Sequence, residues 1–402
     1  MANVSSSNGL EKYPKLRFPG FTEPYRQCCI GEIYAERSQR GASEMELLSV
    51  TMNGGVKPRS EIEGKDNSSD DKSNYKIVRT GDMVYNSMRM WQGANGISPC
   101  EGIVSPAYTV LMPKRPICNG YFAALFKTPN LINEFRKNSQ GMTSDTWNLK
   151  YPQIETIRIH IPAFDEQEHI STLLGTLDAR IVKQAQLVET LKKYKRGALQ
   201  QIFRDGDDSR NGQWTTVRLG DIFKKASRRN SNGECKNVIT NSAEYGLIPQ
   251  REFFDKDIAV DGNTSNYYVI QKGDFVYNPR KSNTAPYGPF NRYLLSEDGI
   301  ISPLYTCLVL QADIDPAYLA WYFKSDAWYR YIYDNGSQGV RHDRVSMTDD
   351  LLMGIPVSYP TKDQQLRIAR FLDLTEQKLM VAQREYDLLV ATRAGFMQQL
   401  FI

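Results

Sequence analysis

Histidine and cysteine are scarce in this sequence, which has three histidines and six cysteines among 402 residues. Only Cys28 and Cys29 are close together, and adjacent cysteines do not match the ligand spacing of a zinc site, so a structural zinc and a disulfide framework are both disfavoured. No run approaches the roughly 18 apolar residues of a membrane span. The first 15 residues have neither the basic nor the apolar region of a secretory signal, so we expect a cytoplasmic protein without membrane association.

A strong excess of one charge is also lacking. Lysine and arginine total 50, aspartate and glutamate total 46, and the formal net charge is +4. This balance permits a partner with phosphates but does not demand one, so strong attraction to DNA must come from local patches or partner subunits. A length of 402 residues predicts two or three domains.

Internal repetition is the clearest signal in the sequence. Five motifs occur twice in the same order: IGEIY at 30–34 and LGDIF at 219–223, GDMVYN at 81–86 and GDFVYN at 273–278, GIVSPAYTVL at 102–111 and GIISPLYTCL at 299–308, SQG at 139–141 and 337–339, and GALQQIF at 197–203 and GFMQQLF at 395–401. The separation between copies grows only from 189 to 198 residues. The chain is therefore predicted to be a tandem duplication of a unit of nearly 200 residues.

Each half begins with a mixed region. Short β-rich runs at 47–52, 75–79, 82–86 and 107–112 alternate with polar loops, and a helical stretch follows around 119–137. The second half repeats this scheme and has its helical stretch at 317–333. The pattern predicts the α+β class, with two similar mixed α/β domains.

A long helix follows each mixed region. Asp165 is the expected N-cap of the first, and apolar residues then recur at alternating steps of four and three, which is typical of a coiled-coil seam. The predicted seam comprises Ile170, Leu174, Leu177, Ile181, Val188 and Leu191 in the first helix and Ile368, Leu372, Leu379, Tyr386, Leu389 and Phe396 in the second. Gln184 and Lys195 interrupt it, and the cation recurs as Arg393. The first helical pattern covers 165–203, which is 39 residues, and its copy has the same length. At about 1.5 Å per residue each helix would be roughly 58 Å long.

The two helices are expected to pack antiparallel, because a globular region follows the first and precedes the second. The predicted domains are 1–163 (first mixed region), 164–204 (first long helix, a spacer), 205–361 (second mixed region) and 362–402 (second long helix). Two alternatives stay open: the helices are core helices of ordinary domains, or their seam recruits helices of another protein.

Two similar but diverged domains joined by a rigid spacer suit a duplex ligand with two different half-sites. The duplication, the opening YPKLRFPGF at 13–21, the GDMVYN/GDFVYN pair and the two long helices resemble the specificity subunit of type I restriction–modification systems. The resemblance implies that 1–163 and 205–361 are the first and second target recognition domains, which read an asymmetric bipartite DNA target. It also implies association with two modification subunits, which carry an S-adenosylmethionine-dependent adenine methyltransferase. It also implies restriction subunits that use ATP and Mg²⁺ to cleave DNA. The opening YPKLRFPGF has no clear copy in the second half, where RDGDDSRNGQW stands instead.

Catalytic motifs are missing from the sequence. There is no GxxxxGK[ST] phosphate loop, and no Asp/Asn-Pro-Pro-aromatic run of an amino-methyltransferase. His169 is interpreted as a surface residue. We therefore expect a non-catalytic chain without a metal or cofactor of its own. Two rival hypotheses are a free-standing methyltransferase or nuclease, and an interaction scaffold that does not read bases.

Two loops in each half offer side chains of the kind that read base edges or bind phosphate. The loop after each GD(M/F)VYN motif diverges between similar flanks, and the SQG corner of the second half is rich in basic residues; an ordinary hydrophilic loop is the alternative interpretation. The candidate DNA-binding residues are Asn86, Ser87, Arg89, Trp91, Gln92 and Asn95 in the first half and Asn278, Arg280, Lys281, Ser282, Asn283, Tyr287, Ser337, Gln338, Arg341, His342 and Arg344 in the second.

Overall fold

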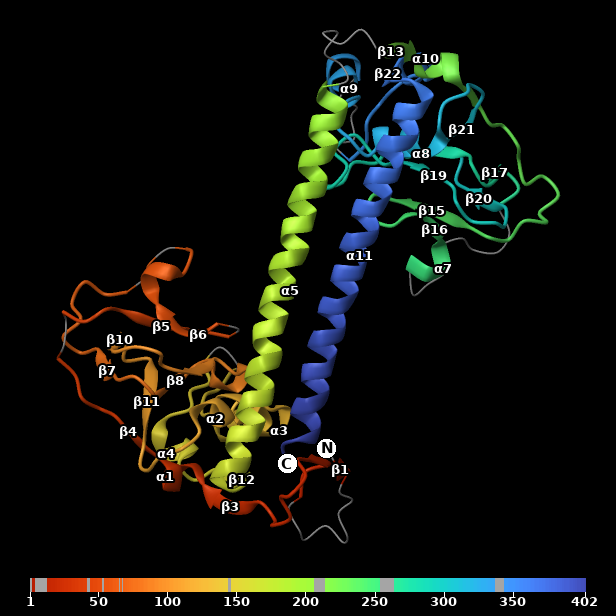
Figure 1. Ribbon diagram of the computed structural model, residues 1–402. Helices are drawn as coiled ribbons and strands as arrows, with labels where there is room; N and C mark the ends of the chain where they lie inside the picture. The colour runs from red at the N-terminus through yellow and green to blue at the C-terminus, as the bar shows by residue number, and fades with distance from the viewer. Residues whose placement is uncertain are drawn as a thin grey trace. The chain divides into compact units, whose positions relative to one another are not determined.

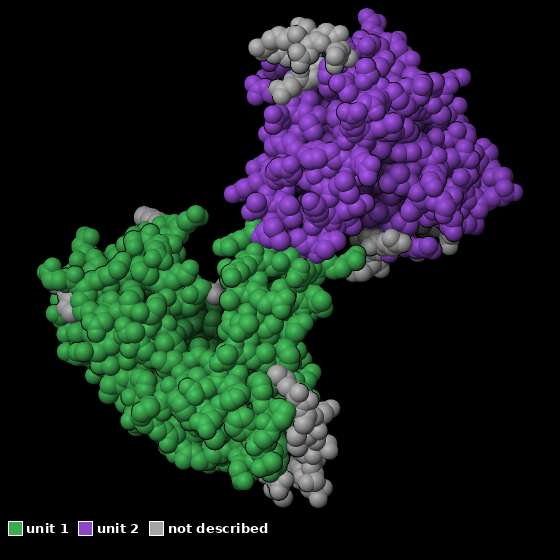
Figure 2. All heavy atoms as spheres, in the orientation of Figure 1, with its two compact units in different colours: residues 1–186, 383–402 green, residues 187–382 purple. Residues whose placement is uncertain are grey.

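A computed structural model describes residues 2–3, 13–41, 44–52, 54–64, 66, 68–143, 146–205, 214–253, 264–336 and 343–402. The chain divides into two compact units, coloured separately in Figure 2: unit 1 is residues 1–186 and 383–402, and unit 2 is residues 187–382. Each unit thus contains one mixed region and a part of both long helices. The predicted domain ranges stay a prediction.

Unit 1 is built mainly of short antiparallel strands and short helices (Figure 1). Its strands are β1 Ala2–Asn3, β2 Leu16–Arg17, β3 Arg26–Cys29, β4 Tyr34–Glu36, β5 Leu48–Thr51, β6 Gly55–Pro58, β7 Lys76–Val78, β8 Met83–Asn86, β9 Asn95–Ile97, β10 Gly102–Val104, β11 Tyr108–Pro113 and β12 Arg158–Ile161. Its short helices are α1 Ile30–Ile33, α2 Asn119–Leu125, α3 Pro129–Asn138, α4 Tyr151–Ile154 and the 3-10 turns η1 Arg59–Glu61 and η2 Met90–Gln92.

Unit 2 repeats this plan. Its strands are β13 Thr215–Arg218, β14 Phe223–Lys225, β15 Ile239–Ser242, β16 Gly246–Pro249, β17 Tyr268–Ile270, β18 Phe275–Tyr277, β19 Phe290–Arg292, β20 Gly299–Ile301, β21 Thr306–Leu310 and β22 Pro356–Tyr359. Its short helices are α6 Leu219–Ile222, α7 Gln250–Phe253, α8 Pro316–Tyr322, α9 Tyr329–Asn335 and α10 Asp349–Met353.

The central sheet confirms the tandem duplication. Its strand order is β4-β11-β8-β9 in unit 1 and β14-β21-β18-β19 in unit 2, with antiparallel pairing throughout. The duplicated motifs form its central pairs, because GDMVYN supplies β8 opposite β11 and GDFVYN supplies β18 opposite β21. Smaller pairs also correspond, with β3–β12 matching β13–β22 and β7–β10 matching β17–β20.

The helical stretch predicted around 119–137 is two helices, which corrects that expectation. Thr128 begins α3 as its N-cap, accepting a hydrogen bond from the backbone N–H of Leu131, and Pro129 occupies the first turn. Proline lacks an N–H and cannot continue the preceding helix, so α2 ends before it. The stretch at 317–333 is likewise divided between α8 and α9.

The long helices are α5 Phe164–Asp205 and α11 Lys362–Gln399 (Figure 1). Because α5 begins at Phe164, Asp165 lies in its first turn and is not the N-cap that the sequence predicted. Within unit 1, Asp178 pairs with Arg393 and Arg180 lies 3.8 Å from Glu385, so partner numbers fall on α11 as they rise on α5. The predicted antiparallel packing is confirmed.

The cationic interruptions of the seam, Lys195 and Arg393, form two equivalent ion pairs. Arg393 Nη2 donates to Asp178 Oδ2 at 3.1 Å in unit 1, and Lys195 Nζ donates to Glu376 Oε2 at 2.7 Å in unit 2. The 198-residue repeat converts each pair into the other, so the same contact between the long helices recurs in both units. All twelve predicted seam residues are buried or half-buried.

Both ends of the seam merge with the cores of the mixed regions. In unit 1, Ile170 and Leu174 pack in one cluster with Tyr121, Phe122 and Leu400. In unit 2, Leu372 packs in the corresponding cluster with residues that include Phe203, Tyr318 and Trp321. The helices therefore anchor the mixed region within each unit.

Candidate nucleic-acid interface

The described parts of the two loops predicted in each half are neighbours in the structure. We call residues 86–95 with 139–143 and 146–149 loop cluster 1, and residues 278–288 with 343–345 loop cluster 2. In each cluster the first segment follows a central strand of the four-stranded sheet, β8 or β18, and the second segment is hydrogen-bonded to the first through the backbone.

A backbone hydrogen bond joins the two segments of loop cluster 1. The N–H of Leu149 donates to the carbonyl oxygen of Ser87 at 2.8 Å. Trp91 and Trp147 add an edge-to-face contact with ring centroids 5.2 Å apart. The segments are therefore fixed to each other.

Loop cluster 2 uses an equivalent backbone bond. The N–H of Val345 donates to the carbonyl oxygen of Pro279 at 2.9 Å, and the N–H of Lys281 donates to Asp343 at 2.9 Å. The bond from Val345 corresponds to the bond from Leu149 at nearly the repeat separation. The duplicated scaffold thus holds two differing loops in the same way.

Several predicted residues present polar groups at the surface. Arg89 and Gln92 are exposed in loop cluster 1, as are Ser282 and Asn283 in loop cluster 2. The Arg280 side chain is 68% exposed and lies 4.0 Å from Asp343, to which half-exposed Arg344 is also close at 3.8 Å.

The positive charges of loop cluster 2 act on Tyr305. Burial raises the pKa of Tyr305, and the charges of Arg280 and Arg344 act in the opposite direction. Half-buried Lys281 adds a third basic group to the same cluster.

Other predicted residues point inward. The Ser87 hydroxyl lies 2.8 Å from that of Thr109, and the buried amides of Asn95 and Asn278 donate to the carbonyl oxygens of Phe126 and Asn241 at 3.3 Å. These side chains stabilise the loops from within.

Three predicted residues are intermediate in exposure and locally bonded. Asn86 accepts from the N–H of Met88, Trp91 donates its indole N–H to the Met88 carbonyl, and the Tyr287 ring lies 5.0 Å from that of Tyr329. Ser337, Gln338, Arg341 and His342 lie outside the described residues. The DNA contacts of all these residues stay predictions.

The aspartate of the GD motif has a structural role that explains its repetition. Asp82 accepts from Arg37 Nε at 2.7 Å and from the N–H of Arg79 at 2.8 Å. In unit 2, Asp274 pairs with Arg228 and accepts from the N–H of Gln271 at 2.8 Å. The carboxylate thus fixes the turn that starts each central strand.

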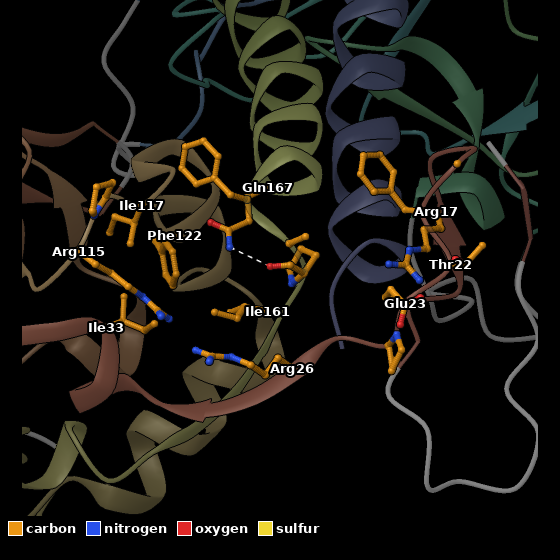
Figure 3. A pocket seen from close by; sticks show the side chains of 17 residues that line it. Arg17, Thr22, Glu23, Arg26, Ile33, Arg115, Ile117, Phe122, Ile161 and Gln167 are labelled. Atoms are coloured by element: carbon orange, nitrogen blue, oxygen red, sulfur yellow. Dashed lines mark hydrogen bonds between the residues drawn. The ribbon is translucent and has the colours of Figure 1, made fainter.

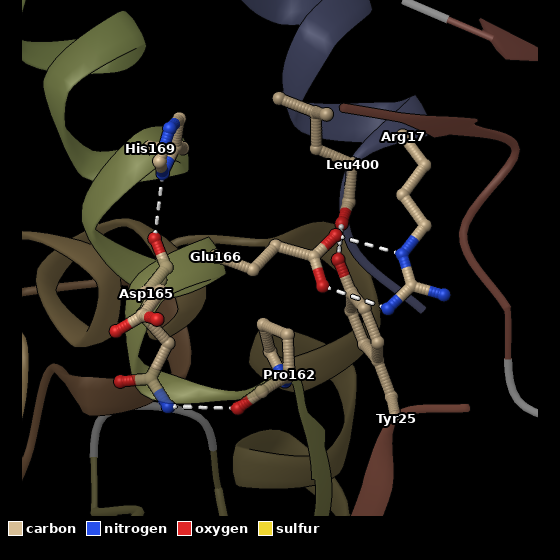
Figure 4. A network of polar contacts seen from close by, with 8 residues as sticks. Arg17, Tyr25, Pro162, Asp165, Glu166, His169 and Leu400 are labelled. Atoms are coloured by element: carbon tan, nitrogen blue, oxygen red, sulfur yellow. Dashed lines mark hydrogen bonds and ion pairs between the residues drawn. The ribbon is translucent and has the colours of Figure 1, made fainter. Parts of the chain in front are cut away.

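Sequence reasoning missed how the opening segment is held (Figure 4). Arg17 donates from Nε and Nη2 to the two carboxylate oxygens of Glu166 at 2.9 and 2.8 Å, and both side chains are almost fully buried. This bond holds the pKa of Arg17 above its usual value, although burial acts against it. His169 is exposed, as expected for a surface residue, but its ring also contacts those of Phe18 and Phe21. The missing second copy of YPKLRFPGF was the one available signal.

Two features are absent from the described residues: a cluster of metal-ligating side chains and a helix able to cross a membrane. Within those ranges, no three histidine, cysteine, aspartate or glutamate side chains gather closely enough to hold a metal ion. No helix in the described part of the chain has both the length and the apolar character needed to cross a membrane.

Comparisons with known proteins agree with the predicted resemblance, although no family model matches the chain. A putative type I restriction enzyme MjaX specificity subunit of Methanocaldococcus jannaschii is 23% identical over 215 residues, which are 46% of this chain and 49% of that protein. The MjaIX specificity subunit of the same organism is 25% identical over 152 residues, 34% of each chain. The matches thus span half or less of these relatives.

Solved structures extend the likeness to nearly the whole fold. The HsdS subunit of Thermoanaerobacter tengcongensis covers 97% of this chain and 98% of its own, with 16% identity and a TM-score of 0.52. The S subunit of a type I restriction–modification system from M. genitalium covers 97% of this chain and 99% of its own, with 16% identity and a TM-score of 0.57. In sequence over part of its length and in fold over nearly all of it, the chain is similar to the specificity subunits of type I restriction–modification systems.

Proposed function

We propose that the chain is the DNA-reading subunit of a type I restriction–modification complex and has no catalytic activity of its own. Loop clusters 1 and 2 each read one half of an asymmetric, bipartite target in double-stranded DNA. The observation that carries this proposal is the equivalent backbone bonding of two loop pairs with different side chains, through Leu149 in unit 1 and Val345 in unit 2. A shared frame with diverged tips suits two readers of different sequences.

The exposed polar side chains of each loop cluster determine which bases or phosphates that cluster can contact. Exposed Arg280 and half-exposed Arg344 can contact guanine or phosphate, whereas Gln92 has the amide geometry suited to adenine. Loss of one good base contact costs about 1–3 kcal/mol of discrimination. Because the net charge is only +4, partner subunits supply much of the phosphate neutralisation.

The long helices also act as a platform for partner subunits in this proposal. Leu374 and Val381 lie seven residues apart on the unit 2 part of α11 and are 49% and 64% exposed. Exposed apolar residues at heptad spacing suit packing against another helix. Helices of the two modification subunits occupy this face, and those subunits bind S-adenosylmethionine, while any restriction subunits bind ATP and Mg²⁺.

The test of DNA reading is a genome-wide map of methylated adenines in cells that carry the chain and its partners. The double variant Arg280→Ala/Arg344→Ala should relax or abolish one half-site only, and Arg89→Ala should affect the other. Arg330→Ala, an exposed arginine of α9 outside both clusters, is the matched control and should leave the map unchanged.

Two outcomes would contradict the proposal. An unchanged methylation pattern in the double variant would favour a scaffold that reads no bases. Methyl transfer from labelled S-adenosylmethionine, or DNA cleavage with Mg²⁺, by the purified chain alone would favour a free-standing enzyme.

A further inference from the structure

A cavity of about 520 Å³ lies in unit 1 (Figure 3). The opening segment, strand β3, the loop after β11 and the first turn of α5 surround it. Its apolar lining includes Ile33, Ile117, Phe122 and Ile161. Such a volume accommodates a short peptide segment or a small molecule.

The charged side chains around the cavity are mainly cationic. Arg26 and Arg115 line it and are exposed, and no described carboxylate forms an ion pair with either. Both are close enough to Cys28 for their charges to favour its thiolate, although burial raises the pKa of that thiol overall. Glu23 is the one acid among the described lining residues. The third lining arginine, Arg17, is already paired with Glu166, which lies outside the lining. The mouth is therefore suited to a carboxylate.

The side chain of Gln167, which also lines the cavity, has a buried acceptor without a hydrogen-bond donor in the described part of the chain. Its Nε2 donates to the carbonyl oxygen of Pro162 at 3.0 Å, and its Oε1 is buried without a hydrogen-bond partner among the described residues, while the whole residue is 6% exposed. A buried acceptor without a donor is costly, so a ligand that brings one is favoured.

The second half of the chain shows what that acceptor normally receives. Gln365, one repeat along, makes the same Nε2 bond to Pro360 at 2.8 Å, and its Oε1 accepts from the backbone N–H of Asp315 at 2.8 Å. The duplication thus provides an internal comparison, in which a backbone N–H satisfies Gln365 and no described donor satisfies Gln167.

We propose that this cavity binds an acidic peptide segment of another protein. The segment inserts an apolar side chain between Ile117 and Ile161, places a carboxylate at Arg26 and Arg115, and donates a backbone N–H to Gln167. A nucleic acid backbone would neither cover the apolar lining nor provide that donor.

The test is a binding titration of the full chain with a fluorescein-labelled peptide in which glutamates flank a phenylalanine–leucine pair. Two companion peptides replace the glutamates by glutamines or the apolar pair by serines. We expect saturable binding of the first peptide. Each companion should bind at least about tenfold more weakly, because it loses either the charge-assisted or the apolar contribution.

A charge-matched pair of variants separates the cavity from the general charge of the unit. Arg26→Gln/Arg115→Gln should weaken binding by about tenfold or more. Arg136 and Lys137 are exposed residues of α3 that do not line the cavity, so Arg136→Gln/Lys137→Gln should leave binding unchanged. Ile117→Ser should weaken it as well. Hydrogen exchange in unit 1 verifies that each variant is folded.

The proposal is overturned if the acidic apolar peptide shows no saturable binding, or if both paired variants bind it equally. Displacement of the peptide by inorganic phosphate or a short DNA duplex, dependent on Arg26, would identify a phosphate site and also overturn it. Arg26→Gln/Arg115→Gln should leave the methylation map unchanged, because neither arginine belongs to a loop cluster. Failure of the peptide titration and failure of the DNA-reading proposal are therefore distinguishable.

Discussion

The buried pair between Arg17 and Glu166 gives the sharpest test of how the opening segment is held. The side chains are 4% and 1% exposed, and two hydrogen bonds of 2.9 and 2.8 Å join them (Figure 4). Glu166→Gln leaves the guanidinium of Arg17 buried without its counter-charge. Such an uncompensated buried charge costs about 3–5 kcal/mol.

The double variant Arg17→Met/Glu166→Gln should cost clearly less than the sum of the single variants, because neither charge is then left alone. We expect a coupling energy of about 2 kcal/mol or more from the double-mutant cycle. The same cycle on Lys195 and Glu376, whose side chains are 26% and 32% exposed, should give about 1 kcal/mol or less.

The assay is hydrogen exchange resolved by peptide, because two units sharing their helices need not unfold in one transition. Unit 1 peptides report the Arg17–Glu166 cycle, and unit 2 peptides report the Lys195–Glu376 cycle. A loss below about 1 kcal/mol in Glu166→Gln, or additive single variants, would refute the argument that burial makes this pair strong.

Three further results are expected. Gly288 has φ of +85° and an added Cβ would lie 1.9 Å from the carbonyl oxygen of Asn278, so Gly288→Ala should destabilise unit 2 by about 2–4 kcal/mol in hydrogen exchange of unit 2 peptides. Gly197, in α5, has open space at that position, so Gly197→Ala should instead stabilise by about 0.5–1 kcal/mol in the same assay. Burial raises the pKa of Cys307 from 9.0 to about 12, so its contribution to stability is present below the lower value and lost as pH rises. Wild-type unit 2 should lose about 1.4 kcal/mol between about pH 8 and pH 10 that Cys307→Ala retains, and equal slopes would contradict this.

Part of the architecture was predictable because it depends on local patterns. The duplicated motifs predicted two related α+β halves, and the alternating apolar steps from Ile170 and Ile368 predicted the two long helices. Their antiparallel packing followed from connectivity, since a globular region lies between them in the chain. The breaks at Thr128 and before α9 were missed, because apolar periodicity continues across a capped helix boundary.

The candidate site was only partly predictable, because side-chain direction depends on long-range packing. Sequence alone placed Ser87, Asn95 and Asn278 beside exposed Arg89 and Arg280, yet the first three are buried and bonded internally. A polar residue in a polar loop gives no local signal of which face it occupies.

The sequence by itself determined that the protein consists of two copies of one unit with diverged loops, since repetition and periodicity are properties of residue order. Only the tertiary structure decided what the opening segment does, because Arg17 and Glu166 are 149 residues apart and nothing local links them. The same contact places that segment beside Gln167, whose counterpart Gln365 has a partner in its own fold. Sequence order specifies the repeat, and three-dimensional packing creates the difference between its copies.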